Sequence, residues 1–418
     1  MLELMRVNKR LFSIIIVSVL ILGAVIISFA VKRNNHSTVS NEYIYDSVDT
    51  SCYYSEKNVL YLDGSDILHL IDTDSGKDIV YCDKPNCMHE GYSHKNENPS
   101  CPAAFFGLSK SGNVLYNGHL YFLGNMTDED LITQYLYEMD PNGENRKKVA
   151  TLRGIQDIRY VLYRDNYVIG GYVNRVVLND AGQIINDNKP EAGIFVIDLE
   201  NHKVNKGTIL TGEEINITGI YYEDGFVYYT VARFKDDVSE AVLADVSERD
   251  FEDFTYDNLL HDIYKYDINN NENFLLSEID HIYNLELHGK DVYFTTKDGY
   301  YNYNISSGET VSLDIVGNVA PKDKNRFRGF TKNGNDLYFS YLNENNEVAY
   351  FLLRGTNLKE LMRIPNESSF MMVCICGTSV YINYYDHGDF CLGVMNINDL
   401  NNGIFNPLKL RRYNEENQ

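Results

Sequence analysis

Asn117-Gly118-His119-Leu120-Tyr121-Phe122 places a tight turn directly before an aromatic strand, and the same arrangement recurs along the chain. Further copies read Asp224-Gly225-Phe226-Val227-Tyr228-Tyr229, Gly289-Lys290-Asp291-Val292-Tyr293-Phe294 and Gly334-Asn335-Asp336-Leu337-Tyr338-Phe339. Turn residues followed by β-branched and aromatic residues are typical of β-hairpins. The repeat therefore predicts an all-β architecture of similar units.

A second strand phrase follows each aromatic strand and ends in a polar turn, as in Ile263-Tyr264-Lys265-Tyr266-Asp267 before Ile268-Asn269-Asn270. Two such strands with two flanking partners make one propeller blade. The units begin at turns near Lys57, Gly118, Asp165, Gly225, Gly289, Gly334 and Gly377. The sequence thus predicts a β-propeller of about seven four-stranded blades, with six or eight as alternatives. We expect pairing of Tyr43-Ile44-Tyr45 with the segment 404–410 to close the ring.

The N-terminal part of the chain carries a long apolar run from Leu11 to Val31. A helix of this length spans a bilayer, and Arg6, Lys9 and Arg10 before it keep the N-terminus in the cytoplasm. Cleavage at Ser28-Phe29-Ala30, as in a signal peptide, is the alternative. We expect a single-pass cell-membrane protein with its C-terminal domain outside the cytoplasm: cytoplasmic segment 1–10, transmembrane signal-anchor 11–31, linker 32–42, β-propeller 43–410 and tail 411–418.

The chain is strongly acidic, with a formal net charge of -23 over 418 residues. Such a surface repels the phosphates of nucleic acids and of anionic lipids. Nucleic acid is therefore not expected as a partner, and contact with the membrane is expected only through the N-terminal helix.

The aromatic strands resemble those of low-density-lipoprotein-receptor-type propellers, whose blades carry a Tyr-Trp-Thr-Asp phrase and which are similar to a large group of uncharacterised exported bacterial propellers. Val227-Tyr228-Tyr229-Thr230 and Val292-Tyr293-Phe294-Thr295 come closest, although this chain contains no Trp. The resemblance covers about residues 43–410 and implies the fold. It implies no activity, because this architecture serves enzymes, receptors and scaffolds.

Cys82, Cys87, His89 and Cys101, with His94 nearby, gather thiols and imidazoles in one short segment that also resembles a cluster in the first blade of that bacterial group. Three sulfurs and one nitrogen suit a closed tetrahedral zinc site. A disulfide is an equal alternative in an extracytoplasmic compartment, and redox or catalytic use is a third. Either of the first two would staple the first blade.

The remaining cysteines are Cys52, Cys374, Cys376 and Cys391. Cys374 and Cys376 alternate on one predicted strand, so they face the same side of it, with Cys391 on the next strand. We interpret them as small buried apolar residues.

An acidic insertion between Arg233 and His261 interrupts the repeats, and we expect a short helix or loop there. Long insertions from a rigid ring commonly carry recognition, although a solvated loop is the plainer interpretation. Its candidate partner-binding residues are Asp236, Asp237, Glu240, Asp245, Glu248 and Asp250.

Local signatures of catalysis are absent from the sequence: there is no nucleophile elbow, no His-Glu-x-x-His and no phosphate-binding glycine loop. The sequence therefore favours a membrane-anchored, non-catalytic recognition or scaffolding module for a protein, peptide or glycan. The alternative is a cell-envelope hydrolase or lyase whose acids converge on the propeller funnel.

Overall fold

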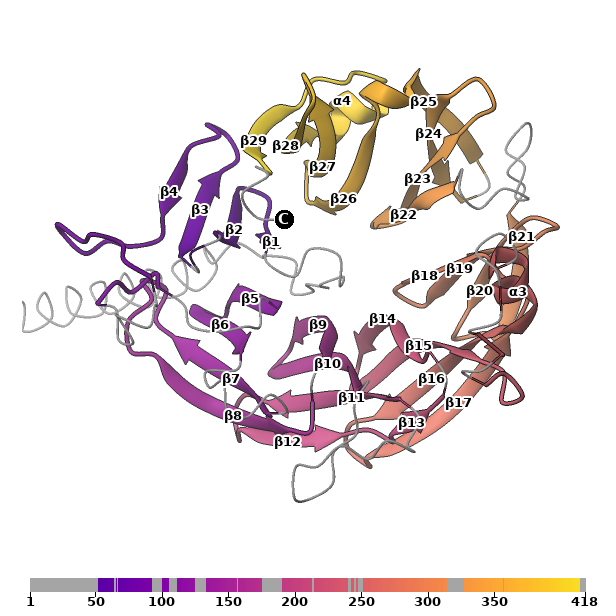
Figure 1. Cartoon of the computed structure of the whole chain (residues 1–418), viewed down its shortest axis with the longest axis horizontal. Coiled ribbons are helices and arrows are strands. Elements are labelled where there is room, and N and C mark those ends of the chain that lie inside the picture. Colours follow the sequence, from indigo (N-terminus) through magenta and orange to yellow (C-terminus); the bar gives the residue numbers. More distant parts are fainter. Residues whose placement is uncertain are drawn as a thin grey trace, which may run out of the picture. The chain divides into compact units, whose positions relative to one another are not determined.

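The computed structural model describes residues 52–413 except 64, 66, 92–99, 105–110, 125–132, 156, 175–189, 213, 240–241, 244–245, 247–250, 314–326 and 356. Within these residues the strands form seven antiparallel sheets arranged around a common axis (Figure 1). The prediction of a seven-bladed, all-β propeller with four-stranded blades is confirmed.

The first three blades occupy the N-terminal half of the ring. Blade 1 contains β1 (Cys52–Tyr54), β2 (Asn58–Leu62), β3 (Leu68–Asp72) and β4 (Asp78–Val80). Blade 2 contains β5 (Ser111–Tyr116), β6 (His119–Gly124), β7 (Thr133–Met139) and β8 (Lys147–Arg153). Blade 3 contains β9 (Asp157–Arg164), β10 (Tyr167–Asn174), β11 (Glu191–Asp198), β12 (Lys203–Lys206) and a short fifth strand, β13 (Leu210–Thr211), which also pairs with β11.

Four further blades complete the ring. Blade 4 contains β14 (Asn216–Glu223), β15 (Phe226–Phe234), β16 (Leu259–Asp267) and β17 (Glu272–Ile279). Blade 5 contains β18 (Asn284–His288), β19 (Asp291–Thr295), β20 (Tyr300–Asn304) and β21 (Glu309–Leu313). Blade 6 contains β22 (Phe327–Asn333), β23 (Asp336–Leu342), β24 (Glu347–Arg354) and β25 (Asn357–Pro365). Blade 7 contains β26 (Phe370–Cys376), β27 (Ser379–Asp386), β28 (Asp389–Asn396) and β29 (Leu408–Arg412).

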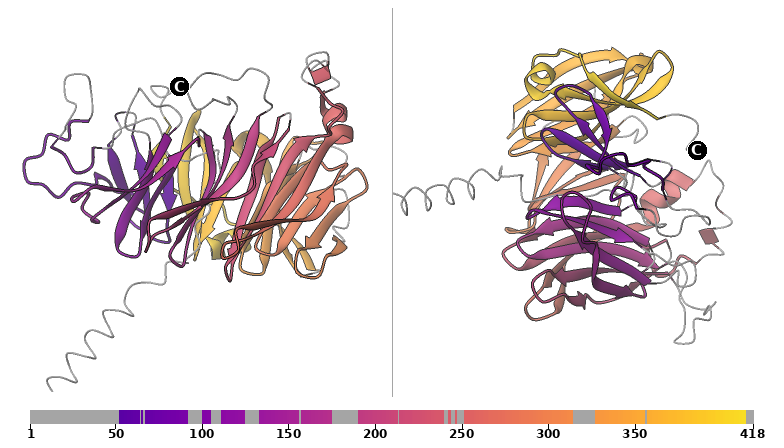
Figure 2. Two further views of the ribbon diagram at one scale, coloured as in Figure 1. Left: turned by 90° about the horizontal axis from the view of Figure 1, so that it is seen from below. Right: turned by 90° about the vertical axis from the view of Figure 1, so that its left-hand side faces the viewer.

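Among the described residues, short helices lie in three of the connections. The acidic insertion contains α3 (Phe251–Asn258), which projects from one face of the ring (Figure 2). The 3-10 helix η2 (Asn366–Ser368) joins blades 6 and 7, and α4 (Ile397–Asn401) joins β28 to β29. None of the helices among the described residues is long and apolar enough to cross a membrane, and the predicted span 11–31 lies outside those residues.

The hairpin between the first and second strands of each blade holds the turn that the sequence marked. In blade 2, Asn117 and Gly118 both have positive φ, 49° and 79°. Two successive positive φ values are the signature of the two-residue hairpin turn whose twist matches that of the flanking strands. The local sequence thus determined where each blade begins.

In turns between the third and fourth strands, an aspartate side chain accepts hydrogen bonds from backbone N–H groups of the turn. Asp72 accepts a hydrogen bond from the backbone N–H of Ser75 at 2.8 Å, and Asp267 accepts one from Asn269 at 2.9 Å. A short carboxylate that satisfies the turn's own N–H groups makes the turn independent of distant contacts.

Tyrosines pack between neighbouring blades. Tyr116 of blade 2 contacts Tyr163 of blade 3, with ring centroids 5.7 Å apart, and Tyr293 contacts Phe330 across blades 5 and 6 at 5.5 Å. An aromatic side chain buries 150–250 Å², which at about 25 cal/mol per Å² corresponds to about 4–6 kcal/mol of transfer free energy each. This packing holds the blades side by side.

The prediction that terminal strands close the ring is not what the structure shows. Every described blade is built from consecutive strands: β1 pairs with β2, and β29 pairs with β28 of its own blade. Tyr43 to Tyr45 lie outside the described residues. Side chains rather than a shared sheet join blade 7 to blade 1, among them Tyr54 and Tyr381, whose rings lie 4.8 Å apart.

Candidate metal centre

The connection between β4 and β5 brings four potential metal ligands together at the outer rim of the ring, beside blades 1 and 2 (Figure 1). One ligand atom from each of Cys82, Cys87, His89 and Cys101 lies within 4.8 Å of the others. The structure thus confirms that these four residues form one cluster that could hold a metal ion.

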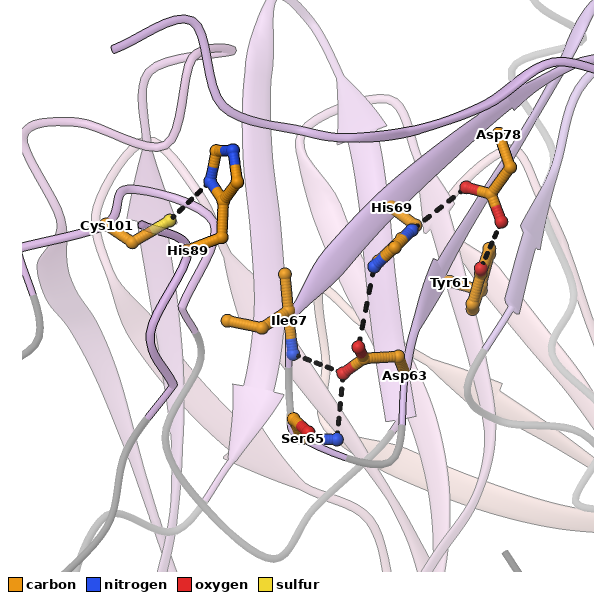
Figure 3. Close-up of polar contacts among 8 residues, drawn as sticks. All are labelled: Tyr61, Asp63, Ser65, Ile67, His69, Asp78, His89 and Cys101. Carbon is orange, nitrogen blue, oxygen red and sulfur yellow. Dashed lines mark hydrogen bonds and ion pairs between the residues drawn. The ribbon is translucent and has the colours of Figure 1, made fainter. Parts of the chain in front are cut away.

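The distance between two of the donor atoms matches that in a tetrahedral zinc site. Cys101 Sγ lies 3.6 Å from His89 Nδ1 (Figure 3). In a tetrahedral site with Zn–S bonds of about 2.3 Å and Zn–N bonds of about 2.0–2.1 Å, sulfur and nitrogen are about 3.6 Å apart. Three thiolates and one imidazole are also a common structural zinc ligand set.

Two left-handed residues shape the first half of the cluster. Asn86 has φ 58° and His89 has φ 52°, a conformation that non-glycine residues rarely adopt. Asn86 lies inside a turn in which the N–H of Cys87 donates to the carbonyl of Lys84 at 3.3 Å, and His89 follows this turn. The chain therefore reverses twice within a few residues, which lets Cys87 and His89 serve one centre despite their close spacing.

The second half of the cluster is anchored to both neighbouring blades. Leu68 N–H of blade 1 donates to the carbonyl of Ala103 at 2.8 Å, and Ala104 forms an antiparallel bridge with Ile67. From blade 2, an Nη2 atom of Arg146 donates to the carbonyls of Pro102 at 3.3 Å and Ala104 at 2.8 Å. Cys101, which is 4% exposed, is thus fixed where blades 1 and 2 meet.

A network of polar residues in blade 1 supports this anchor, and sequence reasoning missed it (Figure 3). Asp63 Oδ1 accepts hydrogen bonds from the N–H groups of Ser65 and Ile67, at 2.8 and 2.9 Å. The ring of His69 lies between two carboxylates, 3.5 Å from Asp63 Oδ2 and 2.9 Å from Asp78 Oδ1. The network fixes Ile67, which pairs with Ala104. It therefore helps to position the segment that carries Cys101.

Two thiols of the cluster differ in acidity. Burial, together with smaller contributions from the neighbouring thiols, raises the pKa of Cys101 to about 12. The backbone N–H of His89, followed by hydrogen bonds from Cys101 and Cys82, lowers the pKa of Cys87. A divalent cation would favour the thiolate form of all three, because it neutralises the charge that burial penalises.

The other predicted site residues are only partly described by the structure. All seven cysteines are free thiols in the structure, and His94 lies outside the described residues. Of the acidic insertion, Asp236 and Asp237 are described. The side chain of Asp236 is 98% exposed and lies 3.5 Å from Arg233. The remaining candidates lie outside the described residues: Glu240, Asp245, Glu248 and Asp250.

The alternative of a hydrolase or lyase requires acidic side chains on the inner strands of the ring. Three carboxylates lie on the inner strands that the structure describes. Asp157 on β9 lies 2.5 Å from Arg159, Glu223 on β14 is paired with Lys290, and Glu286 on β18 lies 3.8 Å from His288. All three side chains are between 33% and 42% exposed. Each carboxylate therefore has a cationic or titratable neighbour and access to water.

No protein-family model matches the chain, and no curated protein matches it. Among solved structures it is similar to an acylaminoacyl peptidase from Pyrococcus horikoshii, with 13% identity and a TM-score of 0.47, over 90% of this chain and 53% of that one. It is also similar to the propeller domain of the Trilobed protease from Pyrococcus furiosus, described as having an open velcro topology, with 12% identity and a TM-score of 0.47, over 89% and 100%. Dipeptidyl peptidase 4 from Porphyromonas gingivalis matches with 9% identity and a TM-score of 0.44, over 91% and 60%. The chain spans about half the length of the acylaminoacyl peptidase.

These likenesses concern the fold, and they correct one prediction. A non-catalytic recognition or scaffolding module was expected, whereas several of the similar solved structures are peptidases or a protease domain. The comparisons therefore contradict that prediction, and the hydrolase alternative remains a proposal. The resemblance to receptor-type propellers is not confirmed by these comparisons.

Proposed function

We propose that Cys82, Cys87, His89 and Cys101 hold one structural zinc ion that fastens blade 1 to blade 2 of a hydrolase-associated propeller in the cell envelope. The observation that carries the zinc site is the convergence of four donors of the right kind within 4.8 Å. Four protein ligands leave no coordination position for water, which distinguishes structural from catalytic zinc. The metal would stabilise the ring rather than take part in the reaction.

The disulfide alternative accounts for fewer of the observations. A single disulfide would use two of the three sulfurs and leave both the third thiol and His89 without a role at the same centre. A zinc ion uses all four groups, including the imidazole that lies 3.6 Å from Cys101.

Metal analysis of the full chain, purified in detergent without chelator, tests the site. We expect about one zinc per chain, lost in Cys87→Ser and in His89→Ala but retained in Cys391→Ser, which alters a buried cysteine of blade 7. A zinc-free protein whose Cys82, Cys87 or Cys101 reacts with thiol reagents only after reduction would instead establish the disulfide.

The hydrolytic activity would reside either in the ring or in a domain or partner associated with it. The inner-strand carboxylates support the first arrangement, because hydrolases and lyases use pairs of acids as acid and base. Asp157 and Glu286 lie on β9 and β18, the innermost strands of blades 3 and 5 (Figure 1).

Assays with aminoacyl and peptidyl chromogenic substrates and with acidic polysaccharides separate the two arrangements. Catalysis by the ring predicts turnover that falls at least about a hundredfold in Asp157→Asn or Glu286→Gln. Turnover that is absent, or unchanged in both variants, would assign the chemistry to a separate domain or partner.

The location of the protein is also a proposal. The apolar run 11–31 supports a single-pass anchor with the propeller outside the cytoplasm, where peptides or glycans of the envelope would be the substrates. Protease added to intact cells should then degrade the propeller. Protection until the cells are lysed would contradict this orientation.

A relation to receptor-type propellers is supported by one structural regularity. Thr230, Thr295 and Ser340 end the corresponding phrases of three second strands, β15, β19 and β23, and each is at most 2% exposed. A buried hydroxyl at the same place in three blades is consistent with descent from one repeat.

A further inference from the structure

The outermost strand of blade 4, β17, exposes an apolar stretch to water. Phe274, Leu275 and Leu276 are 45%, 53% and 38% exposed. Within the described residues β17 pairs with β16 alone, on its inner side (Figure 1). The outer edge of such a strand carries N–H and C=O groups that no neighbouring strand satisfies, so a further strand can pair with it.

Outer strands elsewhere in the ring carry cations, which discourage pairing with a further strand. On four of these strands the cations are Lys147, Lys148 and Arg153 of β8, Lys203 and Lys206 of β12, Lys359 and Arg363 of β25, and Lys409, Arg411 and Arg412 of β29. The outer strands β4, β17 and β21 carry none, and they have 3, 8 and 5 residues. β17 therefore combines length, apolar side chains and a lack of cations, which leaves its edge open to pairing.

A bulge that recurs in four blades shows that an apolar side chain of β17 lacks the cover it has elsewhere. The outer strands of blades 2, 4, 6 and 7 each contain one extra residue opposite the third strand: Val149, Leu276, Leu361 and Leu410. Val149 and Leu410 are 8% and 7% exposed, and Leu361 packs against the core cluster of blades 6 and 7. Of the four, Leu276 alone is exposed. Blade 4 thus leaves open a position that three other blades cover.

The charges around β17 favour one kind of occupant. Glu272 and Glu278 flank the apolar stretch, and both are exposed. Arg233 lies 3.2 Å from Glu278. The same guanidinium also contacts Asp236 and Asp262, so one cation serves three carboxylates. A second copy of this chain, with its net charge of -23, would be repelled, whereas a segment with apolar residues between Lys or Arg residues matches both the stretch and its acidic flanks.

We propose that the outer edge of β17 docks an extended segment of a partner protein, in which alternating apolar residues are flanked on both sides by Lys or Arg. The segment pairs with β17 through main-chain hydrogen bonds and adds a strand to the outside of blade 4. Its apolar side chains cover Leu275 and Leu276, and its cations face Glu272 and Glu278. This inference is independent of the proposed zinc site and of the hydrolytic activity.

The test is the binding of a fluorescein-labelled peptide, Lys-Lys-Val-Thr-Val-Leu-Val-Thr-Lys-Lys, to the full chain in detergent, measured by fluorescence anisotropy against a detergent blank. We expect a Kd of about 100 μM or tighter, because main-chain hydrogen bonds and apolar contacts act together. Leu275→Lys places a cation on the edge and should weaken binding at least about tenfold. Leu408→Lys is the matched control and should bind like the parent, because Leu408 is 40% exposed on β29, the outer strand of blade 7.

Two further peptides separate strand pairing from attraction by charge alone. Replacing the central Leu of the peptide by Pro keeps its charge but disrupts pairing, and should weaken binding at least about tenfold. A peptide with Glu in place of every Lys should not bind, because it meets the acidic flanks of β17.

An unchanged far-ultraviolet spectrum shows that both variants are folded. The proposal is overturned if the parent does not bind the peptide, if Leu408→Lys weakens binding as much as Leu275→Lys, or if the proline peptide binds equally well. Light scattering that shows a dimer of the full chain, dissociated by Leu275→Lys, would assign the edge to a second copy and would also overturn it.

Discussion

The protein has two groups of cysteines, one at the outer rim of blades 1 and 2 and one at the seam between blades 7 and 1. At the rim, three thiols and an imidazole come from an irregular segment, and three of the four residues are partly exposed. At the seam, the thiols lie on two regular strands within an apolar cluster. The cysteines of the two groups therefore differ in what they can bind. The irregular segment brings four donor atoms to one point, whereas a strand places alternate side chains in a row on one face. Replacing one cysteine in each group is the most direct way to test this difference.

The largest effect is expected from Cys101→Ser in zinc-replete buffer. The variant should lose about 3–5 kcal/mol of unfolding free energy, because it removes both a zinc ligand and a buried thiol at the junction of two blades. Cys376→Ser should lose less than about 1 kcal/mol, because this thiol contributes packing and one long hydrogen bond to the carbonyl of Tyr54, at 3.6 Å. Denaturant unfolding of both variants measures the difference, and equal losses would remove the distinction between the two groups.

A smaller effect comes from His261 of blade 4. It is a loss of stability at acid pH, where release of zinc would also destabilise the protein. Burial lowers the pKa of His261 from 6.5 to about 4, and its Nδ1 makes no hydrogen bond to any described residue. Between these pH values the unfolded chain binds more protons than the folded protein. The contribution of His261 to stability is therefore complete above pH 6.5 and is lost as the pH falls to about 4, by about 3 kcal/mol.

Zinc-free protein separates the acid sensitivity caused by buried histidines from the loss of stability caused by zinc release. The slope of unfolding free energy against pH between 4 and 6.5 should become shallower in His261→Leu. His288, whose pKa burial also lowers to about 4, accounts for a second share that the variant retains. A slope that His261→Leu leaves unchanged would show that His261 is not a source of the acid sensitivity.

The smallest effect concerns reactivity in the metal-free protein. Cys87, whose pKa the backbone N–H of His89 lowers, should be alkylated by iodoacetamide at least about tenfold faster than Cys101 or Cys374, whose pKa values are raised. Mass spectrometry of peptides after timed labelling at pH 7.5 gives the order. Zinc should suppress labelling of Cys87 and leave that of Cys374 unchanged. Suppression of both by one equivalent of zinc would show that the two groups are not distinct.

Much of the fold could be predicted because the deciding signals are local. The hairpin turn at Asn117 and Gly118 and the carboxylate-capped turn after Asp267 are set by residues within four positions. These devices repeat, so the number of blades and their order follow. The four residues of the metal centre could also be predicted, since they fall within 20 consecutive residues.

Contacts between distant parts of the chain could not be predicted in this way. The closure of the ring was assigned to terminal strands, whereas side chains such as Tyr381 join blade 7 to residues more than 300 positions earlier. The polar network of Asp63, His69 and Asp78 carries no spacing signal, because its members become neighbours only when β2, β3 and β4 pair.

The sequence by itself determined the repeating strands, the turns and the presence of a thiol-rich segment, because each depends on backbone preferences and side-chain alternation over a few residues. Only the tertiary structure decided how the ring closes and which carboxylates lie on its inner strands. The physical reason is that these features depend on how seven twisted sheets pack against one another. That packing arises from many weak apolar contacts, none of which is encoded at a single position.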